Sequence, residues 1–294
     1  MTLDVNQTAT QAVPQAVIDS MCCLERRADS TLDYGTHVSQ ILARAEACGV
    51  TTLINAGFDP ETDETPWVDL QTLHTGVTVW RAVGLHPLAI RMRSYNRQLA
   101  RVEHLLMQPG VVALGEIGLD TRDRSIPLDI QSDVLIRQLD IAQRRRVPVI
   151  IHCVKAVGRL FEILRDVGPL PAGGMLHGFS GPRDLIPMCL DLNLSMSFGT
   201  SVLDPNATRA HTAAIAVPAS HMLVESGSLD CLGLAKYGPG YGPVCEPSSV
   251  VSVLKQLALL RKQSEHALAA CTTANARRLF GLVAIDSDTV SKVD

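Results

Sequence analysis

A chain of 294 residues is long enough for one α/β barrel or for two smaller domains, and its net charge of −4 gives no general attraction to nucleic acid. This charge does not exclude a nuclease, because bound metal ions can supply positive charge locally. No stretch reaches the roughly 20 apolar residues of a membrane-spanning helix, so we expect no membrane partner.

The eight cysteines contain no CxxC pair, which argues against a zinc ribbon or a redox motif. Residues 1–16 lack the basic start and the apolar stretch of a signal peptide. Both observations predict a cytoplasmic protein whose thiols stay reduced.

Short apolar runs alternate with helical patterns along most of the chain. The runs are rich in Val, Ile and Leu and do not alternate with polar residues, which is typical of parallel strands buried on both faces. Helical periodicity marks Thr36–Ala47 and Ser132–Arg145, and we expect Ser132 to be an N-cap. The predicted strands are Val17–Asp19, Thr52–Ala56, Thr78–Val83, Val111–Glu116, Pro148–His152, Gly174–His177, Leu194–Phe198 and Met222–Glu225.

Eight strands alternating with helices predict an α/β fold, a single-domain (β/α)8 TIM barrel over residues 17–282. An open doubly wound sheet is the alternative, although such a sheet usually has fewer strands. We expect residues 1–16 to be a flexible N-terminal arm and residues 283–294 a polar C-terminal tail. Gly227–Pro247, rich in glycine and proline, is expected to be the longest loop.

Polar residues stand at the ends of several predicted strands. The carboxyl ends of barrel strands converge on one face, where catalytic groups gather. A single histidine after a strand is more often a core residue than a ligand, but Glu116, His152 and His177 end three consecutive predicted strands. Two histidines and one carboxylate can bind one divalent ion and leave positions open for water. These three residues are therefore the candidate metal ligands.

Several motifs together carry a family resemblance. They are GLHP at 84–87, GEIGLD at 115–120, IIHC at 150–153, HGFSG at 177–181 and NARRLF at 275–280. With these motifs the chain resembles the TatD-type deoxyribonuclease family, metal-dependent hydrolases of the amidohydrolase-like TIM-barrel group, from about Val17 to Leu282. The resemblance implies two adjacent divalent metals bridged by a glutamate. Glu116, His152 and His177 match the ligands of one of these two sites.

The other implied metal site departs from the family pattern. Where the family has H-x-H on the first strand, this chain has Met21 and Cys23, and where the family has E-T-D, it has Glu225-Ser226-Gly227. Methionine is a poor ligand for hard divalent ions, and glycine has no side chain. We therefore expect one divalent metal ion per chain at most, and the residues do not distinguish Zn, Mg and Mn. Asp19 matches an acidic position of the family and is expected to orient a ligand.

The resemblance also implies roles for single residues. Glu116 takes the metal-bridging catalytic position, and His86 of GLHP is expected to contact substrate. Lys155 either neutralises a bound anion or is simply solvated at the barrel rim. Two functions stay open: a divergent TatD-like hydrolase of DNA-type phosphodiesters, and a catalytically inactive scaffold. Such a scaffold would bind nucleic acid, a nucleotide-like ligand or a partner protein.

Overall fold

The computed structural model of this protein describes residues 16–24, 34–61, 76–227 and 246–282. The expected C-terminal tail, almost all of the expected N-terminal arm and most of the expected loop after the last strand lie outside these ranges, so they stay predictions. Within these ranges, no helix is both long enough and apolar enough to cross a bilayer.

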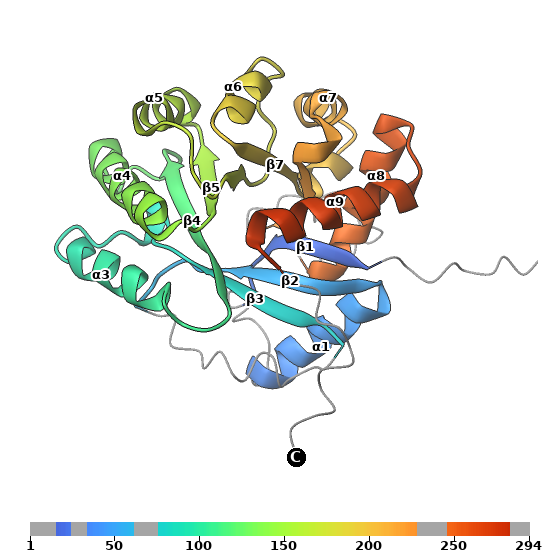
Figure 1. Ribbon diagram of the computed structural model, residues 1–294, viewed down its shortest axis with the longest axis horizontal. Helices are drawn as coiled ribbons and strands as arrows, with labels where there is room; N and C mark the ends of the chain where they lie inside the picture. Colours follow the sequence, from blue (N-terminus) through green and yellow to red (C-terminus); the bar gives the residue numbers. More distant parts are fainter. Residues whose placement is uncertain (1–15, 25–33, 62–75, 228–245, 283–294) are drawn as a thin grey trace, which may run out of the picture.

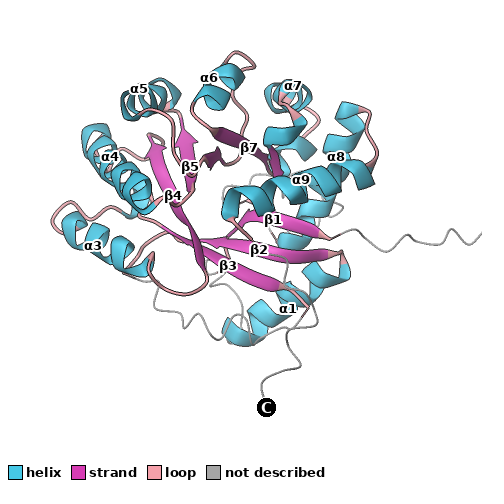
Figure 2. Ribbon diagram, in the orientation of Figure 1, coloured by secondary structure: helices cyan, strands magenta, loops and turns pink. Residues whose placement is uncertain are grey.

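Eight parallel strands of the described chain form a closed ring, and each strand pairs with the next one in sequence. The ring closes between β8 and β1, where Gly227 N donates to Met21 O at 3.1 Å. Figures 1 and 2 show the strands surrounded by helices. The predicted (β/α)8 barrel is confirmed, and the open sheet is excluded. The strands are β1 Val17–Cys22, β2 Val50–Ala56, β3 Thr78–Val83, β4 Val111–Asp120, β5 Val149–Val154, β6 Gly174–Leu176, β7 Leu194–Phe198 and β8 Met222–Val224.

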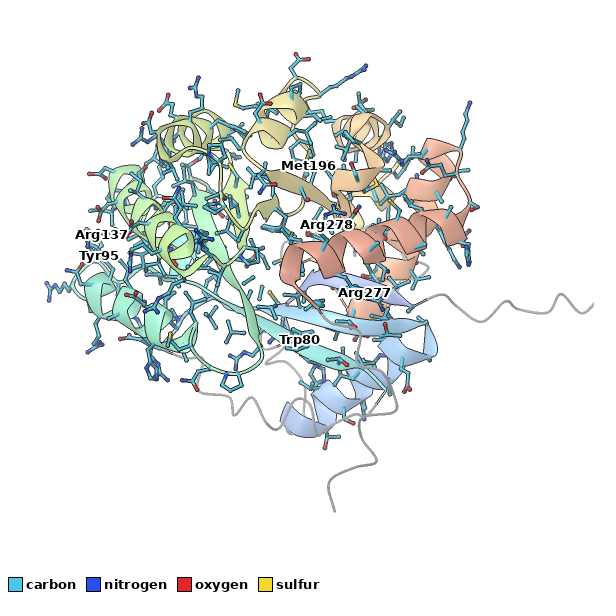
Figure 3. All side chains as sticks on the ribbon, in the orientation of Figure 1. Trp80, Tyr95, Arg137, Met196, Arg277 and Arg278 are labelled. Atoms are coloured by element: carbon cyan, nitrogen blue, oxygen red, sulfur yellow. The ribbon has the colours of Figure 1, made fainter. Side chains whose placement is uncertain are left out.

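The helices cover the outside of the barrel with amphipathic faces. In the helix Val157–Val167, buried Leu160 and Leu164 lie four residues apart, which places both on the face toward the strands. Neighbouring helices also contact one another: the guanidinium carbon of Arg137 lies over the ring of Tyr95, 5.7 Å from its centroid. Figure 3 shows the two residues side by side. The α-helices are α1 Tyr34–Ala47, α3 Tyr95–Leu105, α4 Leu128–Arg145, α5 Val157–Val167, α6 Leu185–Asp191, α7 Thr208–Ala216, α8 Val250–Arg261 and α9 Glu265–Phe280. The short 3-10 helices are η1 Pro87–Ala89, η2 Thr200–Leu203, η3 Ala219–His221 and η6 Pro247–Ser249.

Some predicted boundaries differ from those observed. Helix α4 begins at Leu128, directly after Pro127, so Ser132 is not its N-cap. Instead, the Ser132 hydroxyl donates to the carbonyl of Leu128 at 2.7 Å, as a residue inside the helix. Strand β4 continues past its predicted end to Asp120, which places Glu116 within the strand.

The barrel interior is a separate apolar cluster to which nearly every strand contributes. Helix α9 supplies Ala276 and Phe280 to this cluster and so closes the amino-terminal opening of the barrel (Figure 1). The side-chain amide of Asn275 anchors the helix by donating to the carbonyls of Ala219 and Met222, at the start of β8. The NARRLF motif therefore covers the amino-terminal end of the barrel, and the polar residues lie at its carboxyl-terminal end.

The GEIGLD motif brings β4 unusually close to β5. Gly118 pairs with His152 and has a φ of 147°, a region that favours glycine. A Cβ at Gly118 would collide with the backbone carbonyl oxygen of His152. The absence of a side chain at this position is therefore what lets the two strands place Glu116 and His152 side by side.

Candidate metal centre

Three neighbouring strands bring the predicted ligands together at the carboxyl end of the barrel. Glu116 lies in β4, His152 in β5, and His177 directly after β6. Nδ1 of His152 lies 2.8 Å from Nε2 of His177, which in turn lies 3.4 Å from Oε1 of Glu116. Two nitrogens and one carboxylate therefore face a common point.

The Glu116 carboxylate is fully buried, and neither of its oxygens receives a hydrogen bond from the described part of the chain. Buried carboxylates are normally hydrogen-bonded or bound to a cation, because removing their charge from water costs several kcal/mol. Two bare, buried oxygens beside two imidazoles fit the ligand set of a divalent ion.

Asp120, the last residue of GEIGLD, contacts the ring nitrogen of His152 that faces away from His177. Nε2 of His152 lies 3.2 Å from Oδ2 of Asp120, and Arg122 Nη2 lies 2.7 Å from the same oxygen. Burial alone would raise the pKa of Asp120, but the hydrogen bonds from His152 and Arg122 hold that pKa below its usual range. An ionised Asp120 has no proton to give, so Nε2 of His152 carries the proton and Nδ1 keeps its lone pair.

Glu225, the residue that follows β8, likewise contacts the ring nitrogen of His177 that faces away from His152. Oε1 of Glu225 accepts from the backbone N–H of Gly178 at 2.8 Å and lies 3.4 Å from Nδ1 of His177. This contact places a proton on Nδ1 and leaves the lone pair of Nε2 directed at Glu116. Nδ1 of His152 and Nε2 of His177 lie at hydrogen-bonding distance from each other, and a cation shared by the two nitrogens would replace this contact when both outer nitrogens carry the protons.

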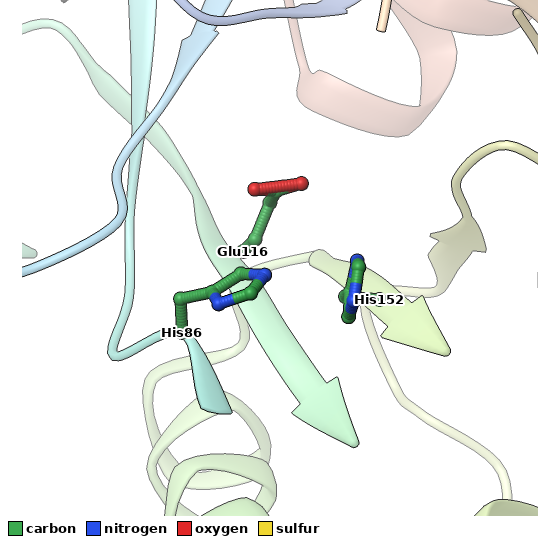
Figure 4. A group of neighbouring side chains, drawn as sticks. All are labelled: His86, Glu116 and His152. Carbon is green, nitrogen blue, oxygen red and sulfur yellow. The ribbon is translucent and has the colours of Figure 1, made fainter. Parts of the chain in front are cut away.

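His86 forms a second grouping with Glu116 and His152, and the candidate ligand atoms of these three residues lie within 4.8 Å of one another. Figure 4 shows Glu116 between the two imidazoles. Nδ1 of His86, however, accepts the backbone N–H of Leu88 at 3.2 Å, so Nε2 carries the proton in the neutral ring. This tautomer makes His86 a hydrogen-bond donor, which suits a phosphoryl oxygen better than a metal ion.

Lys155, the predicted anion-binding residue, directly follows β5. Its side chain is exposed, its backbone is left-handed with a φ of 55°, and it lines a cavity of about 660 Å³ that His152 and His177 also border. Cys153 lines the same cavity, and burial raises the pKa of its thiol to about 11, so the thiol stays protonated at neutral pH.

The residues at the incomplete metal site bond to one another across the closure of the barrel. Asp19 accepts hydrogen bonds from the backbone N–H and the hydroxyl of Ser226, at 2.9 and 2.6 Å. Met21 is fully buried in the inner apolar cluster, and the Cys23 thiol lies 3.9 Å from the carbonyl of Ala56. Gly227 has a φ of 85°. These hydrogen bonds of Asp19 join β1 to the segment after β8, and its role in orienting a ligand stays a prediction.

Two carboxylates that contact the candidate histidine ligands, Asp120 and Glu225, have no role that the sequence pattern alone predicts. Both stand in motifs that the sequence made visible, at the carboxyl ends of β4 and β8. Metal-bound histidines commonly donate their second N–H to a carboxylate. A carboxylate at the end of a strand near two candidate histidine ligands could therefore have predicted these two contacts.

Comparisons with known proteins agree with this geometry. The family model described as TatD related DNase matches residues 18–281. YabD of Bacillus subtilis, named an uncharacterized metal-dependent hydrolase, is 32% identical over 248 residues, which cover 84% of this chain and 94% of YabD. TatD of Rahnella sp., named a 3'-5' ssDNA/RNA exonuclease, is 30% identical over 251 residues, or 83% of this chain and 92% of that protein.

A solved structure supports the same relationship. The crystal structure of YJJV, a TatD homolog from Escherichia coli, has a TM-score of 0.75 to this chain at 25% identity, and it covers 91% of this chain and 98% of its own. The fold, the strand-end motifs and the relatives lead to one conclusion. The chain belongs to the TatD-related DNase family of metal-dependent hydrolases.

Proposed function

We propose that this protein is a phosphodiester hydrolase that holds one divalent metal ion on Glu116, His152 and His177. The observation that carries the proposal is the arrangement of two imidazole nitrogens and two buried carboxylate oxygens without a hydrogen bond around one point. Relatives named 3'-5' ssDNA/RNA exonucleases support a DNA-type phosphodiester as the substrate.

The bound ion would lower the pKa of a water molecule and neutralise charge on the phosphoryl group. The chain's own residues then have separate tasks. Asp120 and Glu225 fix the two histidine ligands in the tautomers that bind metal. His86 donates from Nε2 to a phosphoryl oxygen, and Lys155 attracts the anion at the rim of the cavity.

The one-metal state follows from the positions that lack ligands. Met21 is buried among apolar side chains, and Gly227 has no side chain. Cys23 alone provides one thiol, which suits soft or borderline metals and cannot complete a second site by itself. We therefore expect hydrolysis of DNA to be slow compared with that of a two-metal enzyme.

The same missing ligands favour a second candidate, a catalytically inactive scaffold that binds nucleic acid, a nucleotide-like ligand or a partner protein. In that case Glu116 and the two histidines hold an ion, or a proton, without turnover. The two candidates differ in one measurable property, which is hydrolysis that depends on Glu116.

The decisive experiment measures bound metal and hydrolysis on the same preparations. Wild-type protein, Glu116→Ala and the control Glu162→Ala, an exposed residue on α5, are loaded with Mg, Mn or Zn and freed of excess ion. Metal content and the cleavage of single-stranded DNA and bis(p-nitrophenyl) phosphate are then compared. About one ion per chain, with activity that only Glu116→Ala abolishes, supports the hydrolase. Metal without Glu116-dependent cleavage supports the scaffold, and absence of metal contradicts the site itself.

A further inference from the structure

Two glutamines of α4 are buried where the helix packs against β4 (Figure 1). Gln131 is 1% exposed and Gln138 is fully buried. They stand seven residues apart, which is about two turns, so both side chains leave the same face of the helix. A buried amide costs free energy unless it is hydrogen-bonded, and an apolar side chain would fill the same space without that cost. The hydrogen bonds of the two amides therefore indicate what these residues do.

Gln138 binds the backbone immediately before His86. Its Oε1 accepts the N–H of Leu85 at 2.8 Å, and its Nε2 donates to the carbonyl of the same residue at 3.1 Å. Strand β3 pairs with β4 only as far as Val83 and Leu114, so Leu85 lies beyond the last pair of the ladder. The amide of Gln138 takes the place of a neighbouring strand there. It fixes the peptide groups on both sides of Leu85, and the second of these groups leads directly into His86.

Gln131 binds Asp120 in the same way at the end of β4. Its Oε1 accepts the N–H of Asp120 at 2.8 Å, and its Nε2 donates to the carbonyl of Asp120 at 3.0 Å. Nε2 also donates to the carbonyl of Ile126 at 2.9 Å, in the loop that leads into α4. Both peptide groups of Asp120 are therefore fixed, and the carboxylate of this residue is the group that lies 3.2 Å from Nε2 of His152.

We propose that Gln131 and Gln138 are positioning residues through which one face of α4 sets the geometry of the site. Gln138 acts through His86, the phosphoryl donor. Gln131 acts through Asp120, which contacts the metal ligand His152. The roles of the two histidines rest on the proposed function, whereas the hydrogen bonds of the two glutamines do not. The ring centroids of His86 and His152 lie 4.5 Å apart, so a small displacement of either segment changes their relative position.

The first test follows the histidine rings of the metal-free protein, so it requires neither metal nor turnover. Gln131→Met and Gln138→Met keep a side chain of similar length and remove the amide. The rings are labelled with carbon-13, and their magnetic resonance signals are assigned with the variants His86→Gln and His152→Gln. In Gln131→Met the largest shift should fall on the signal of His152. In Gln138→Met it should fall on the signal of His86.

Gln143→Met is the matched control from the same helix. Gln143 is half-buried, and its amide donates to the carbonyl of Val167, the last residue of α5, at 3.2 Å. The change removes a hydrogen bond between a side chain and the backbone without touching the two segments at the site, so neither signal should move. Circular dichroism verifies folding. Gln131→Glu and Gln138→Glu, which keep the acceptor oxygen and lose the amide, replace a methionine variant that does not fold and should shift the same signals.

The second test asks whether each glutamine acts through its partner. Gln131→Met should weaken metal binding about tenfold, and it should add little to the loss caused by Asp120→Asn. Gln138→Met should leave the metal affinity unchanged. It should weaken the binding of inorganic phosphate, measured by calorimetric titration, about fivefold, and it should add little to the loss caused by His86→Ala.

Two results would overturn the inference. One is additive loss in either double variant, which indicates that the glutamine acts independently of its partner. The other is a pattern of ring signals no different from that of Gln143→Met. A wild type without metal, or without cleavage that depends on Glu116, contradicts the proposed function instead. In that case the ring signals of the metal-free protein still decide whether the two glutamines position the histidines.

Discussion

Nδ1 of His152 and Nε2 of His177 lie 2.8 Å apart, and each ring has a carboxylate near its opposite nitrogen. Asp120 and Glu225 can each accept a proton-bearing outer nitrogen, and in that state both inner nitrogens are available to a cation beside Glu116. A cation between them satisfies all three groups at once.

Glu116→Gln should affect stability in opposite directions in the metal-free and metal-loaded states. Without metal, the change removes a buried charge that lacks a hydrogen bond, so the free energy of unfolding should rise by about 1–3 kcal/mol. With saturating metal, the wild type gains stability from binding and the variant does not. Urea unfolding with and without chelator measures both effects, and the same sign in both states would contradict the ligand role of Glu116.

Asp120→Asn should weaken metal binding about 10- to 100-fold, because His152 loses the acceptor that fixes its tautomer. The fold should persist, because asparagine matches the size of Asp120 and keeps the Oδ1 acceptor for the backbone N–H of Arg122. Competition with a metal-binding dye measures the affinity. Asp123→Asn, an exposed change three residues away, is the control and should bind as wild type. Equal affinities for the two variants would remove Asp120 from the metal centre.

Asp19 should make the protein less stable as the pH rises from about 4 to about 7. Burial raises the pKa of Asp19 from 3.8 to about 7, against the hydrogen bonds from Ser226 and Met21. The folded protein therefore holds this proton more tightly than the unfolded chain, and stability is lost between those two pH values and not beyond them. The loss is on the order of 4 kcal/mol.

Urea unfolding at several pH values tests this prediction with Asp19→Asn as the variant. The asparagine does not titrate, so the dependence on pH between 4 and 7 should become shallower than in wild type by the contribution of Asp19. Asp166→Asn, an exposed residue of α5, should keep the wild-type dependence. Identical slopes for wild type and Asp19→Asn would show that Asp19 titrates at its ordinary value.

Restoring the family's ligands should restore a second metal. The triple variant Met21→His, Cys23→His and Gly227→Asp is expected to bind about two ions per chain, against about one for wild type. The metal-free variant should be less stable, since Met21 is buried and Gly227 has a φ of 85°, where a side chain costs about 1 kcal/mol. Elemental analysis gives the ion count, with Met21→His/Cys23→His as the control. A single ion in the triple variant would mean that these positions do not form the second site.

Much of the barrel could be predicted because its strands are buried on both faces. Continuous apolar runs located every strand, and the bounds of β3 and β7 were predicted to the residue. Helix α4 begins four residues earlier than predicted. The apolar periodicity is weak in its first turn, and Ser132 resembled a typical N-cap more closely than Pro127 does. Closure between β8 and β1 depends on contacts between distant segments, which no local pattern contains.

The candidate site was only partly predictable for a related reason. Residue type and position identified Glu116, His152 and His177 as candidate ligands. Which ring nitrogen of each histidine carries the proton depends, however, on the carboxylate that contacts the ring. Asp120 is 32 residues from His152 and Glu225 is 48 from His177, so neither contact follows from local spacing. The tautomer of His86 likewise depends on a backbone N–H whose direction is set by the turn at η1.

The hydrogen bonds between Asp19 and Ser226, and between Gly227 and Met21, connect the first strand to the segment after the last. In a barrel whose first strand and last strand-end segment both supply ligands to one metal ion, that ion also connects the two segments. In the one-metal state that we propose, hydrogen bonds alone connect these two segments, so chelation should empty the metal centre without opening the ring. We therefore expect the barrel to stay folded whether or not the metal centre is occupied.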